Sequence, residues 1–381
     1  MTGYIVRRLL FFIPTMIAIS LMAFIISINA PGDPVERLMT AETGEAISTN
    51  YDGSENLRSY WRKKLGLDLP VFYFSVAAFD TTVSNGFNPG NYIPAIRFHA
   101  NNRYHRWIFG DGNWVTGNGH QYSKGIIRGD FGISYQTRQP VSEVISEKAG
   151  WSLMLALSSV LFAYLISLPV GMWSGALKNS AFDRYSSAIL FLLYSLPSFW
   201  IATLLLMTFA NPDVIHLFPA SGVKPVTGYP EGANLLDKIK LSLPYLILPL
   251  ICYTYSSLAF ISRALRVSMI ESMNQDYIRT AKAKGLPFRM VVTRHAFRNS
   301  LLPLITIVAN VFPLAIGGSV ILETIFSIPG MGFEIVQSIH NQNYPMIVAV
   351  FTLSGFLTVV GYLISDILYA LADPRITFAG Q

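Results

Sequence analysis

Six apolar stretches, each long enough to cross a lipid bilayer, constrain this chain more than any other feature. A helix needs about 20 mostly apolar residues to cross the hydrocarbon core. Lys and Arg, which cost ~2.5–3.5 kcal/mol at the centre of a span, are absent from all six. Only 13% of the 381 residues are charged, against about 25% in an average soluble chain. The sequence therefore predicts an all-α integral membrane protein with six transmembrane helices, at Leu9–Ile28, Leu153–Ser174, Ile189–Ala210, Leu243–Ile261, Leu301–Ile325 and Met346–Leu371.

The first stretch follows Arg7 and Arg8, as the apolar region of a cleaved signal peptide would. Its length of about 20 residues exceeds the roughly 7–15 residues that are usual in a signal peptide. We therefore expect an uncleaved first span.

Basic loops alternate along the chain and predict its orientation. Short loops rich in Lys and Arg lie on the cytoplasmic side. No Lys or Arg occurs between Asn299 and Pro374. With six spans, both termini are expected in the cytoplasm, and the net charge of +6 needs no nucleic acid to explain it. The basic residues of these loops are Arg7 and Arg8, then Lys178 and Arg184, then Arg263, Arg266, Arg279, Lys282, Lys284, Arg289, Arg294 and Arg298.

This orientation divides the chain into residues 1–30 with the first span, an external segment 31–150, and a membrane core 151–381. Aromatic residues alternate with Gly-, Asn- and Pro-rich turns in the external segment, which favours short strands or hairpins. We expect a compact subdomain over Ser75–Lys124. The spacing of His99, His105 and His120 fits no zinc pattern, so we expect surface or packing roles for them and no metal site.

Several polar residues fall within the predicted spans. Tyr253, Tyr255 and Asn310 are candidates for lining a pathway, with Thr254 beside them. Glu323 and Asp366 lie near span ends, where a structural role competes with a functional one. The single cysteine, Cys252, is expected to be a small buried hydrophobe.

The basic loop between the fourth and fifth stretches contains a short predicted helix with clear ends. Asp276 stands at an N-cap position, and Thr280–Lys284 favours helix through two alanines and two lysines. Gly285 suits a helix C-terminus, and Pro287 follows where a helix cannot continue. A second helix is predicted over Phe288–Asn299.

An ordinary positive-inside loop would account for the charge of this segment but not for the helix and its glycine stop. A short helix that fits a groove on another protein is a common mode of recognition. We therefore expect the first helix to dock on another protein, with Ala281 and Ala283 permitting close approach.

The stretch Asp276–Thr306 resembles the EAA loop of binding-protein-dependent ABC transporter permeases, and most of all the oligopeptide, dipeptide and nickel class. Arg279-Thr280-Ala281 stands where the Glu-Ala-Ala run of that loop lies, a replacement that is usual in the peptide class. The segment Ser75–Lys124 is extra relative to the shortest members. Six further stretches match in the family's order, namely Tyr4–Pro14, Ala30–Val35, Leu65–Pro70, Gly129–Val141, Glu323–Gly332 and Ser365–Arg375.

The resemblance implies a type I ABC importer permease fold in a bacterial inner membrane, with a small external α+β insert between transmembrane helices 1 and 2. It implies a transport subunit, not an enzyme, that forms half of a pathway for peptides. The chain has no GxxxxGK[ST] phosphate loop, so ATP and Mg are expected on partner chains and no cofactor on this one.

The expected partners are a second permease in a heterodimer, two ATP-binding subunits, an external solute-binding protein, the peptide substrate and membrane lipid; nucleic acid is not expected. The coupling loop is residues 266–300. Its expected ATPase-docking residues are Asp276, Arg279, Thr280, Ala281, Lys282, Ala283, Lys284 and Gly285.

Two alternatives stay open. The cargo of such a permease is nickel or another small solute instead of peptides, or the protein is a channel that needs no ATP. A membrane-embedded enzyme would need clustered catalytic groups, and the sequence has no HExxH, no GxSxG and no paired Asp within a span.

Overall fold

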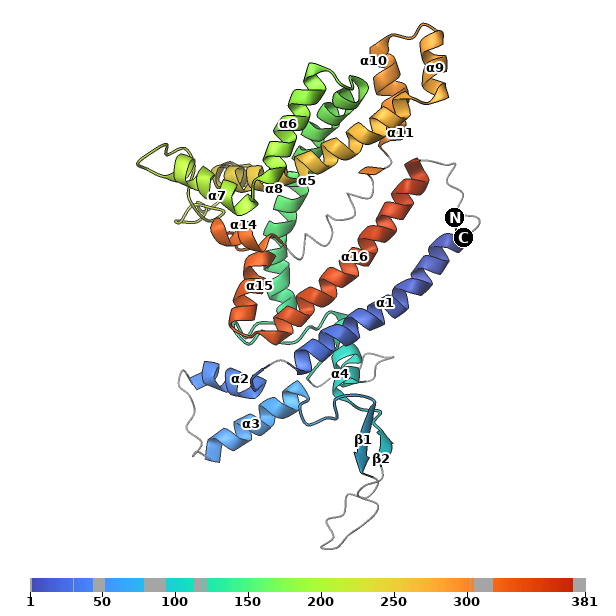
Figure 1. Cartoon of the computed structure of the whole chain (residues 1–381). Helices are drawn as coiled ribbons and strands as arrows, with labels where there is room; N and C mark the ends of the chain where they lie inside the picture. The colour runs from blue at the N-terminus through green and yellow to red at the C-terminus, as the bar shows by residue number, and fades with distance from the viewer. Residues whose placement is uncertain are drawn as a thin grey trace. The chain divides into compact units, whose positions relative to one another are not determined.

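The computed structural model describes residues 2–29, 31–43, 52–78, 94–112, 119, 122–301, 303–304 and 318–372. This part of the chain is mostly helical and forms two compact units (Figure 1). The first unit comprises Met1–Ser20, Ser146–Gln337 and Val350–Gln381, and the second comprises Leu21–Ile145 and Ser338–Ala349. The division of the sequence at residues 30 and 150 stays a prediction.

The elements follow one another as α1 (Thr2–Ile28), α2 (Pro34–Thr43), α3 (Asp52–Leu65), β1 (Phe74–Ala78), β2 (Pro94–Phe98), α4 (Arg103–Phe109), α5 (Val141–Ala176), α6 (Ala181–Ser195), α7 (Ser198–Leu205), α8 (Leu235–Met273), α9 (Asp276–Ala283), α10 (Phe288–Met290), α11 (Phe297–Ser300), α14 (Val320–Ile325), α15 (Met331–His340) and α16 (Tyr344–Ala372). A 3₁₀ turn lies at Ile126–Arg128, and π-helical turns lie at Leu206–Ala210 and Val291–Ala296.

Among the described residues, four helices are long and apolar enough to cross a membrane. They match the first, second, fourth and sixth predicted stretches. The segments that meet this criterion are Leu10–Ile28 in α1, Val141–Ala176 as α5, Leu235–Met273 as α8 and Tyr344–Ile367 in α16.

The third predicted span, Ile189–Ala210, is not one straight helix. α6 ends at Ser195, α7 begins at Ser198, and the chain bends by 91° between them (Figure 1). Proline has no N–H and disfavours a helical conformation at the residue before it, and Leu196 before Pro197 is extended, with φ −87° and ψ 125°. If the bent pair counts as one span, the described part of the chain contains five candidate spans.

The fifth predicted span, Leu301–Ile325, falls mostly outside the described residues, but its end differs from the prediction. α14 covers only the last six residues, Val320–Ile325. Before it, Gly318 has a left-handed backbone (φ +58°) and Ser319 is extended (φ −111°, ψ 97°). Neither conformation continues a helix, so the prediction of an unbroken helix to Ile325 is wrong.

α5 and α8 approach so closely that two positions of α5 have room only for glycine. A Cβ on Gly171 would lie 2.7 Å from the carbonyl oxygen of Ser262. One on Gly175 would lie 2.5 Å from Cβ of Met269. One turn before Gly171, the Ser167 hydroxyl donates to a backbone carbonyl of α8 at 3.1 Å. Small residues four apart are typical of transmembrane helices whose backbones approach closely.

The second unit contains a two-stranded antiparallel sheet in which Phe74 pairs with Phe98 and Ala78 with Pro94. The predicted strands within the insert are therefore present, while its place outside the membrane stays a prediction. His99 Nε2 lies 2.9 Å from the Ser75 hydroxyl. His105 Nδ1 lies 3.0 Å from the Tyr73 hydroxyl, and burial lowers the pKa of this ring.

His99 and His105 thus each have a hydroxyl partner within the second unit, as expected for packing roles, and His120 lies outside the described residues. In the described part of the chain, no three His, Cys, Asp or Glu side chains gather where they could hold a metal ion.

The family-like stretch at Leu65–Pro70 closes helix α3. Gly66 has a left-handed backbone (φ +70°), and its N–H donates to Lys63 O at 3.2 Å. The buried Arg106 of α4 donates to the carbonyls of Lys63 and Lys64 at 2.9 and 2.6 Å. A cation at a helix C-terminus satisfies carbonyls that have no partner within the helix, so Arg106 joins α4 to α3.

The stretch at Gly129–Val141 is fixed by Asn343, a fully buried residue from the turn before α16. Asn343 Oδ1 accepts from the Tyr135 N–H at 2.9 Å, and its Nδ2 donates to the Ser134 hydroxyl at 2.8 Å. These bonds connect parts of the second unit that lie more than 200 residues apart in sequence.

The close α5–α8 crossing predicts that Gly175→Ala destabilises the protein. The added methyl group overlaps Met269, and overpacking of this kind costs ~1–3 kcal/mol. Gly150→Ala, in the same helix, is the matched control because no atom lies within 4 Å of the added Cβ. The midpoint of thermal unfolding in detergent should fall for Gly175→Ala and stay level or rise for Gly150→Ala. Equal midpoints would contradict the packing described here.

Candidate functional site

The predicted docking helix is present as α9, and it begins one residue earlier than expected. The N-cap residue is Gln275, whose side chain makes no capping bond, and Asp276 is the first helical residue. The prediction of Asp276 as the N-cap is therefore wrong by one position. Its carboxylate still lies in the first turn, where the helix dipole favours a negative charge, and lies 3.3 Å from Arg279 Nη1.

The C-terminus of α9 has the glycine stop that the sequence predicts. Gly285 adopts a left-handed backbone with φ +76°. Its N–H donates to Lys282 O at 3.0 Å, and the N–H of Leu286 donates to Ala281 O at 3.4 Å. This pair of bonds is the Schellman motif of helix ends. Pro287 then caps the start of α10.

The second predicted helix is also present. Phe288–Ser300 is helical throughout, as α10, the π turn at Val291–Ala296 and α11. The predicted end at Asn299 differs by one residue, which is the usual uncertainty of a helix boundary.

The inner face of α9 packs against the chain's own core. Ile278 is fully buried and Ala281 is 5% exposed. Both belong to a hydrophobic cluster with Leu265 and Met269 of α8 and Val291 of the π turn. The methyl group of Ala281 is covered by this chain, and its contact with another protein stays a prediction. A small residue here lets α9 lie close to the core.

The outer face of α9 is exposed and basic. The exposed residues of α9 and of the turn that follows it are Asp276, Tyr277, Arg279, Thr280, Lys282, Ala283, Lys284 and Gly285. They include three cations against one carboxylate, and the ion pair between Asp276 and Arg279 is itself highly exposed (93% and 77%). Exposed pairs of this kind contribute little, so these groups are available to a partner.

Hydrogen bonds at Ser272 join α9 to the helices on either side of it. The Ser272 hydroxyl lies 2.6 Å from the Tyr277 hydroxyl and donates to Ala296 O at 3.1 Å. One side chain of α8 thus contacts the first turn of α9 and the π turn. The loop between α8 and α11, drawn at the end of α8 in Figure 1, is consequently packed against that helix.

An ion pair joins α8 to α6, about two turns before Ser272. Arg266 of α8 donates to Asp183 from Nε at 2.6 Å and from Nη2 at 2.8 Å. Asp183 is buried and also accepts from the Ser174 hydroxyl at 2.5 Å and the Asn179 N–H at 2.9 Å. Two parallel bonds from one guanidinium add geometric specificity to the attraction. This carboxylate fixes α5, α6 and α8 at one place.

Glu323 lies in a second buried network. Its side chain is fully buried. Oε1 accepts from the hydroxyls of Ser152 at 2.8 Å and Tyr253 at 3.2 Å and from the Ser319 N–H at 3.2 Å. Oε2 accepts from the Phe333 N–H at 3.0 Å. A carboxylate with four donors is well satisfied in the interior, and it positions the non-helical residues before α14.

Two of the three pathway candidates, Tyr253 and Tyr255, lie in the described part of the chain. Tyr253 donates to Glu323 and accepts from the Ser319 N–H at 3.2 Å. Tyr255 is buried and donates to Leu196 O at the break between α6 and α7, at 3.0 Å. Their hydroxyl groups are engaged inside this chain, so a pathway role for them is not what this arrangement supports. Asn310 lies outside the described residues.

Of the other polar candidates, Cys252 is fully buried, as expected for a small hydrophobe, and Asp366 is half-buried in α16. The sequence interpretation missed Asp183 and Arg266. Ser180 and Asp183 have the Ser-x-x-Asp spacing that begins a helix, and the Ser180 hydroxyl does accept from the Asp183 N–H at 3.2 Å. That signal marks the helix start but not the arginine 83 residues away.

Comparison with known proteins identifies the family. The family described as "binding-protein-dependent transport system inner membrane component" matches residues 167–378. This chain belongs to that family. It is 33% identical to the oligopeptide transport system permease protein AppB of Bacillus subtilis over 99% of this chain and 100% of that protein. It is 29% identical to the dipeptide transport system permease protein DppB of Escherichia coli, over 99% of each chain.

Membership makes this chain a multi-pass inner-membrane permease component of an ABC transporter. Such a component is not a catalytic enzyme and works with a partner permease, a separate ATPase and a solute-binding protein. The resemblance drawn from the loop at Asp276–Thr306 is thereby confirmed at the level of the family.

The Asp183–Arg266 pair predicts that Asp183→Asn lowers stability by roughly 2–3 kcal/mol. Removing one partner of a buried pair costs ~3–5 kcal/mol, and the smaller value reflects the 27% exposure of the Arg266 side chain. Asp237→Asn is the control, since Asp237 is an exposed acid in the first turn of α8. The measurement is the midpoint of thermal unfolding of the two variants in detergent. Equal falls of the midpoint in both variants would refute the prediction.

The network at Glu323 predicts that Tyr253→Phe acts on stability. The substitution removes one of the four donors to the Glu323 carboxylate and one of the two acceptors of the Ser319 N–H, and a hydrogen bond to a charged group contributes ~1.5–3 kcal/mol. Tyr185→Phe on α6 removes a hydroxyl from a side chain that is 71% exposed and should have no effect. A pathway role would instead change transport without changing the unfolding midpoint, and that result would overturn the structural assignment of Tyr253.

Proposed function

We propose that this chain is the permease subunit of an ATP-driven importer of peptides and forms half of its translocation pathway. The observation that carries the cargo assignment is full-length similarity to permeases named for oligopeptide and dipeptide transport. In this proposal an external solute-binding protein delivers the peptide, and a second, different permease completes the pathway.

The proposal places the ATPase on the outer face of α9. Two ATP-binding subunits hold ATP and Mg, and one of them receives α9 in a groove lined by acidic residues. Support comes from the exposed cations Arg279, Lys282 and Lys284. The exposed Thr280, Ala283 and Gly285 lie beside them and allow close approach. Both termini and α9 then lie in the cytoplasm, as the distribution of basic loops predicts.

Packing behind α9 supports a mechanical role. Shifting a two-state equilibrium from 1:99 to 99:1 requires ~5.5 kcal/mol of differential binding. A docked helix transmits that energy only if it does not slip on the core that carries it. Ile278 and Ala281 are covered by the core, and Ser272 bonds to both sides of the loop. Movement of α9 by the ATPase therefore passes to α8, and from α8 through Arg266 to α6.

Charge reversal on α9 tests the docking surface. We expect the double variant Lys282→Glu and Lys284→Glu to lose ATP-dependent uptake of labelled dipeptides and oligopeptides at least tenfold in proteoliposomes that contain the complete transporter. Like charges placed against each other in an interface cost several kcal/mol. Co-purification of the ATPase should fall in parallel, while the unfolding midpoint stays unchanged because both lysines are exposed.

The matched control is the double variant Lys238→Glu and Lys240→Glu. These lysines have the same spacing, are exposed, and lie in the first turns of α8. Normal uptake by the control and loss in the α9 variant support the proposal. Normal uptake in both would sink the docking surface. Uptake of nickel instead of peptides would overturn the proposed cargo. Peptide flux without any ATPase would overturn the ATP-driven mechanism.

A further inference from the structure

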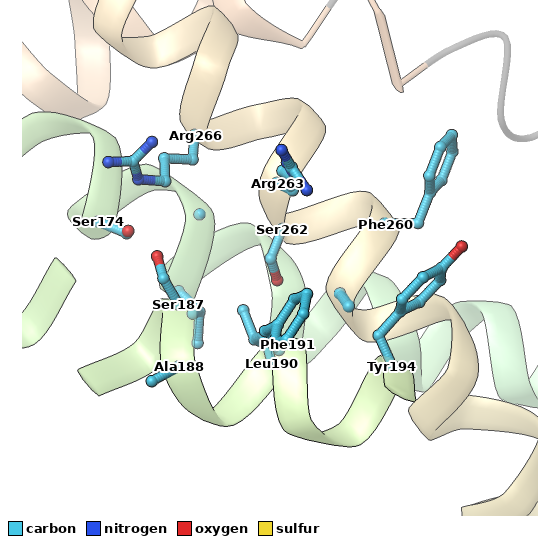
Figure 2. A pocket seen from close by; sticks show the side chains of 13 residues that line it. Ser174, Ser187, Ala188, Leu190, Phe191, Tyr194, Phe260, Ser262, Arg263 and Arg266 are labelled. Carbon is cyan, nitrogen blue, oxygen red and sulfur yellow. The ribbon is translucent and has the colours of Figure 1, made fainter. Parts of the chain in front are cut away.

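A pocket of about 730 Å³ lies between α5, α6 and α8, entirely within the first unit. Figure 2 shows the side chains that line it, with Ser187 and Tyr194 on α6 and Phe260, Ser262, Arg263 and Arg266 on α8. Neither the docking helix nor the Glu323 network uses this pocket. Two of its walls, α5 and α8, are long and apolar enough to cross a membrane, and α6 meets that criterion together with α7. Whatever fills the pocket therefore enters from the bilayer or from a neighbouring membrane helix.

Polar and apolar side chains are separated along the length of the pocket. α6 and α8 run in opposite directions, because Asp183 meets Arg266 near one end and the Leu196 carbonyl meets Tyr255 near the other. Ser187 and Arg263 therefore lie toward the first end. Phe191, Tyr194 and Phe260 lie toward the second. The polar end coincides with the end of the apolar sequence of α8, where Ser262 and Arg263 follow Ile261. A site with this order of groups matches a molecule with a polar head and an apolar tail.

The polar end carries positive charge that this chain does not neutralise. Arg266 is neutralised by Asp183. Arg263 is exposed, and no ion pair or hydrogen bond of its guanidinium occurs among the described residues. No carboxylate is among the residues that line the pocket. The pocket therefore favours an anion.

A second polar group in the pocket also has no partner. Ser262 is only 2% exposed, and its hydroxyl makes no hydrogen bond within the described part of the chain. Its side chain lies between Arg263 and Leu190 in Figure 2. A buried hydroxyl without a partner costs roughly 1–3 kcal/mol, so an acceptor bound beside Arg263 would satisfy both groups.

The surface around the pocket is apolar. Tyr185, Ile189 and Leu192 continue along α6 at helical spacing and are 71%, 57% and 61% exposed. A peptide lying here would leave its backbone polar groups unsatisfied against the aromatic end. Acyl chains have no such groups.

We propose that this pocket binds an anionic phospholipid of the surrounding bilayer. The headgroup phosphate lies at Arg263 and accepts from the Ser262 hydroxyl, and an acyl chain packs along Phe191, Tyr194 and Phe260. Bound lipid would fill the space between α6 and α8 beside the Asp183–Arg266 pair. The proposal depends neither on the peptide cargo nor on the docking of an ATPase at α9.

Native mass spectrometry of the assembled, delipidated transporter tests the headgroup contact. Phosphatidylglycerol and phosphatidylcholine are titrated separately into wild type, Arg263→Gln and the control Arg184→Gln, whose arginine is exposed on α6 outside the pocket. We expect tight phosphatidylglycerol binding that weakens about fivefold in Arg263→Gln alone, the effect of one arginine at a membrane surface. Equal binding of the two lipids, or equal loss in both variants, would overturn the proposal.

Photo-crosslinking identifies the occupant in a background that retains Arg263. Tyr194 is replaced by the photoreactive benzoylphenylalanine, and native membranes containing the whole transporter are irradiated. An adduct with the mass of a phospholipid supports the proposal. A cross-link to the second permease or to a peptide, or no adduct at all, counts against it, and this result decides the matter even if Arg263→Gln fails to fold.

Discussion

The close approach of α5 and α8 is the constraint on which the rest of the first unit depends. In a bilayer, lipid tails are as apolar as Leu, so helices are held together by packing and hydrogen bonds instead of by exclusion from water. Gly171 and Gly175 allow the two backbones to meet, and the Ser167 hydroxyl adds a bond across the contact. With α8 fixed against α5, its side chains reach their partners on α6 at both ends.

In this arrangement α8 contacts the exposed loop and both interior hydrogen-bond networks. Its last turns carry Leu265 and Met269, which cover the inner face of α9, and Ser272, which bonds to both sides of the loop. Its middle carries Tyr253 and Tyr255, which hold the broken segments around α14 and between α6 and α7. The same helix therefore supports both the exposed loop and the interior networks.

Local features of the site could be predicted from the sequence, and long-range ones could not. Gly285 and Pro287 define where α9 ends through backbone conformations that are properties of single residues. The inward direction of Ala281 depends on which face of a two-turn helix meets the core, and alanines occur on both faces. The contact between Asp183 and Arg266 joins residues 83 positions apart, and no local pattern contains it.

Hydropathy had a similar limit in the fold. Hydropathy indicates whether a segment can cross a bilayer, but not whether the segment is straight. It therefore identified the apolar region Ile189–Ala210 but did not predict the break at Pro197. The residue type that causes the break was visible, yet proline also occurs inside continuous helices here, as at Pro169 in α5. The difference lies in whether neighbouring helices keep the chain helical at that point.

The π turn at Val291–Ala296 gives the chain beyond α9 a fixed rotational phase. An α-helix advances about 100° per residue, so the one extra residue in a π turn turns every later side chain by about that angle relative to an unbroken helix. Val291 and Val292 are buried at the start of the turn, Ala296 is buried at its end, and Ser300 is buried in α11. In a related chain that loses or gains one residue in this turn, the same side chains would point in a different direction around the helix axis. The number of residues in this segment therefore matters for the permease as much as their identity.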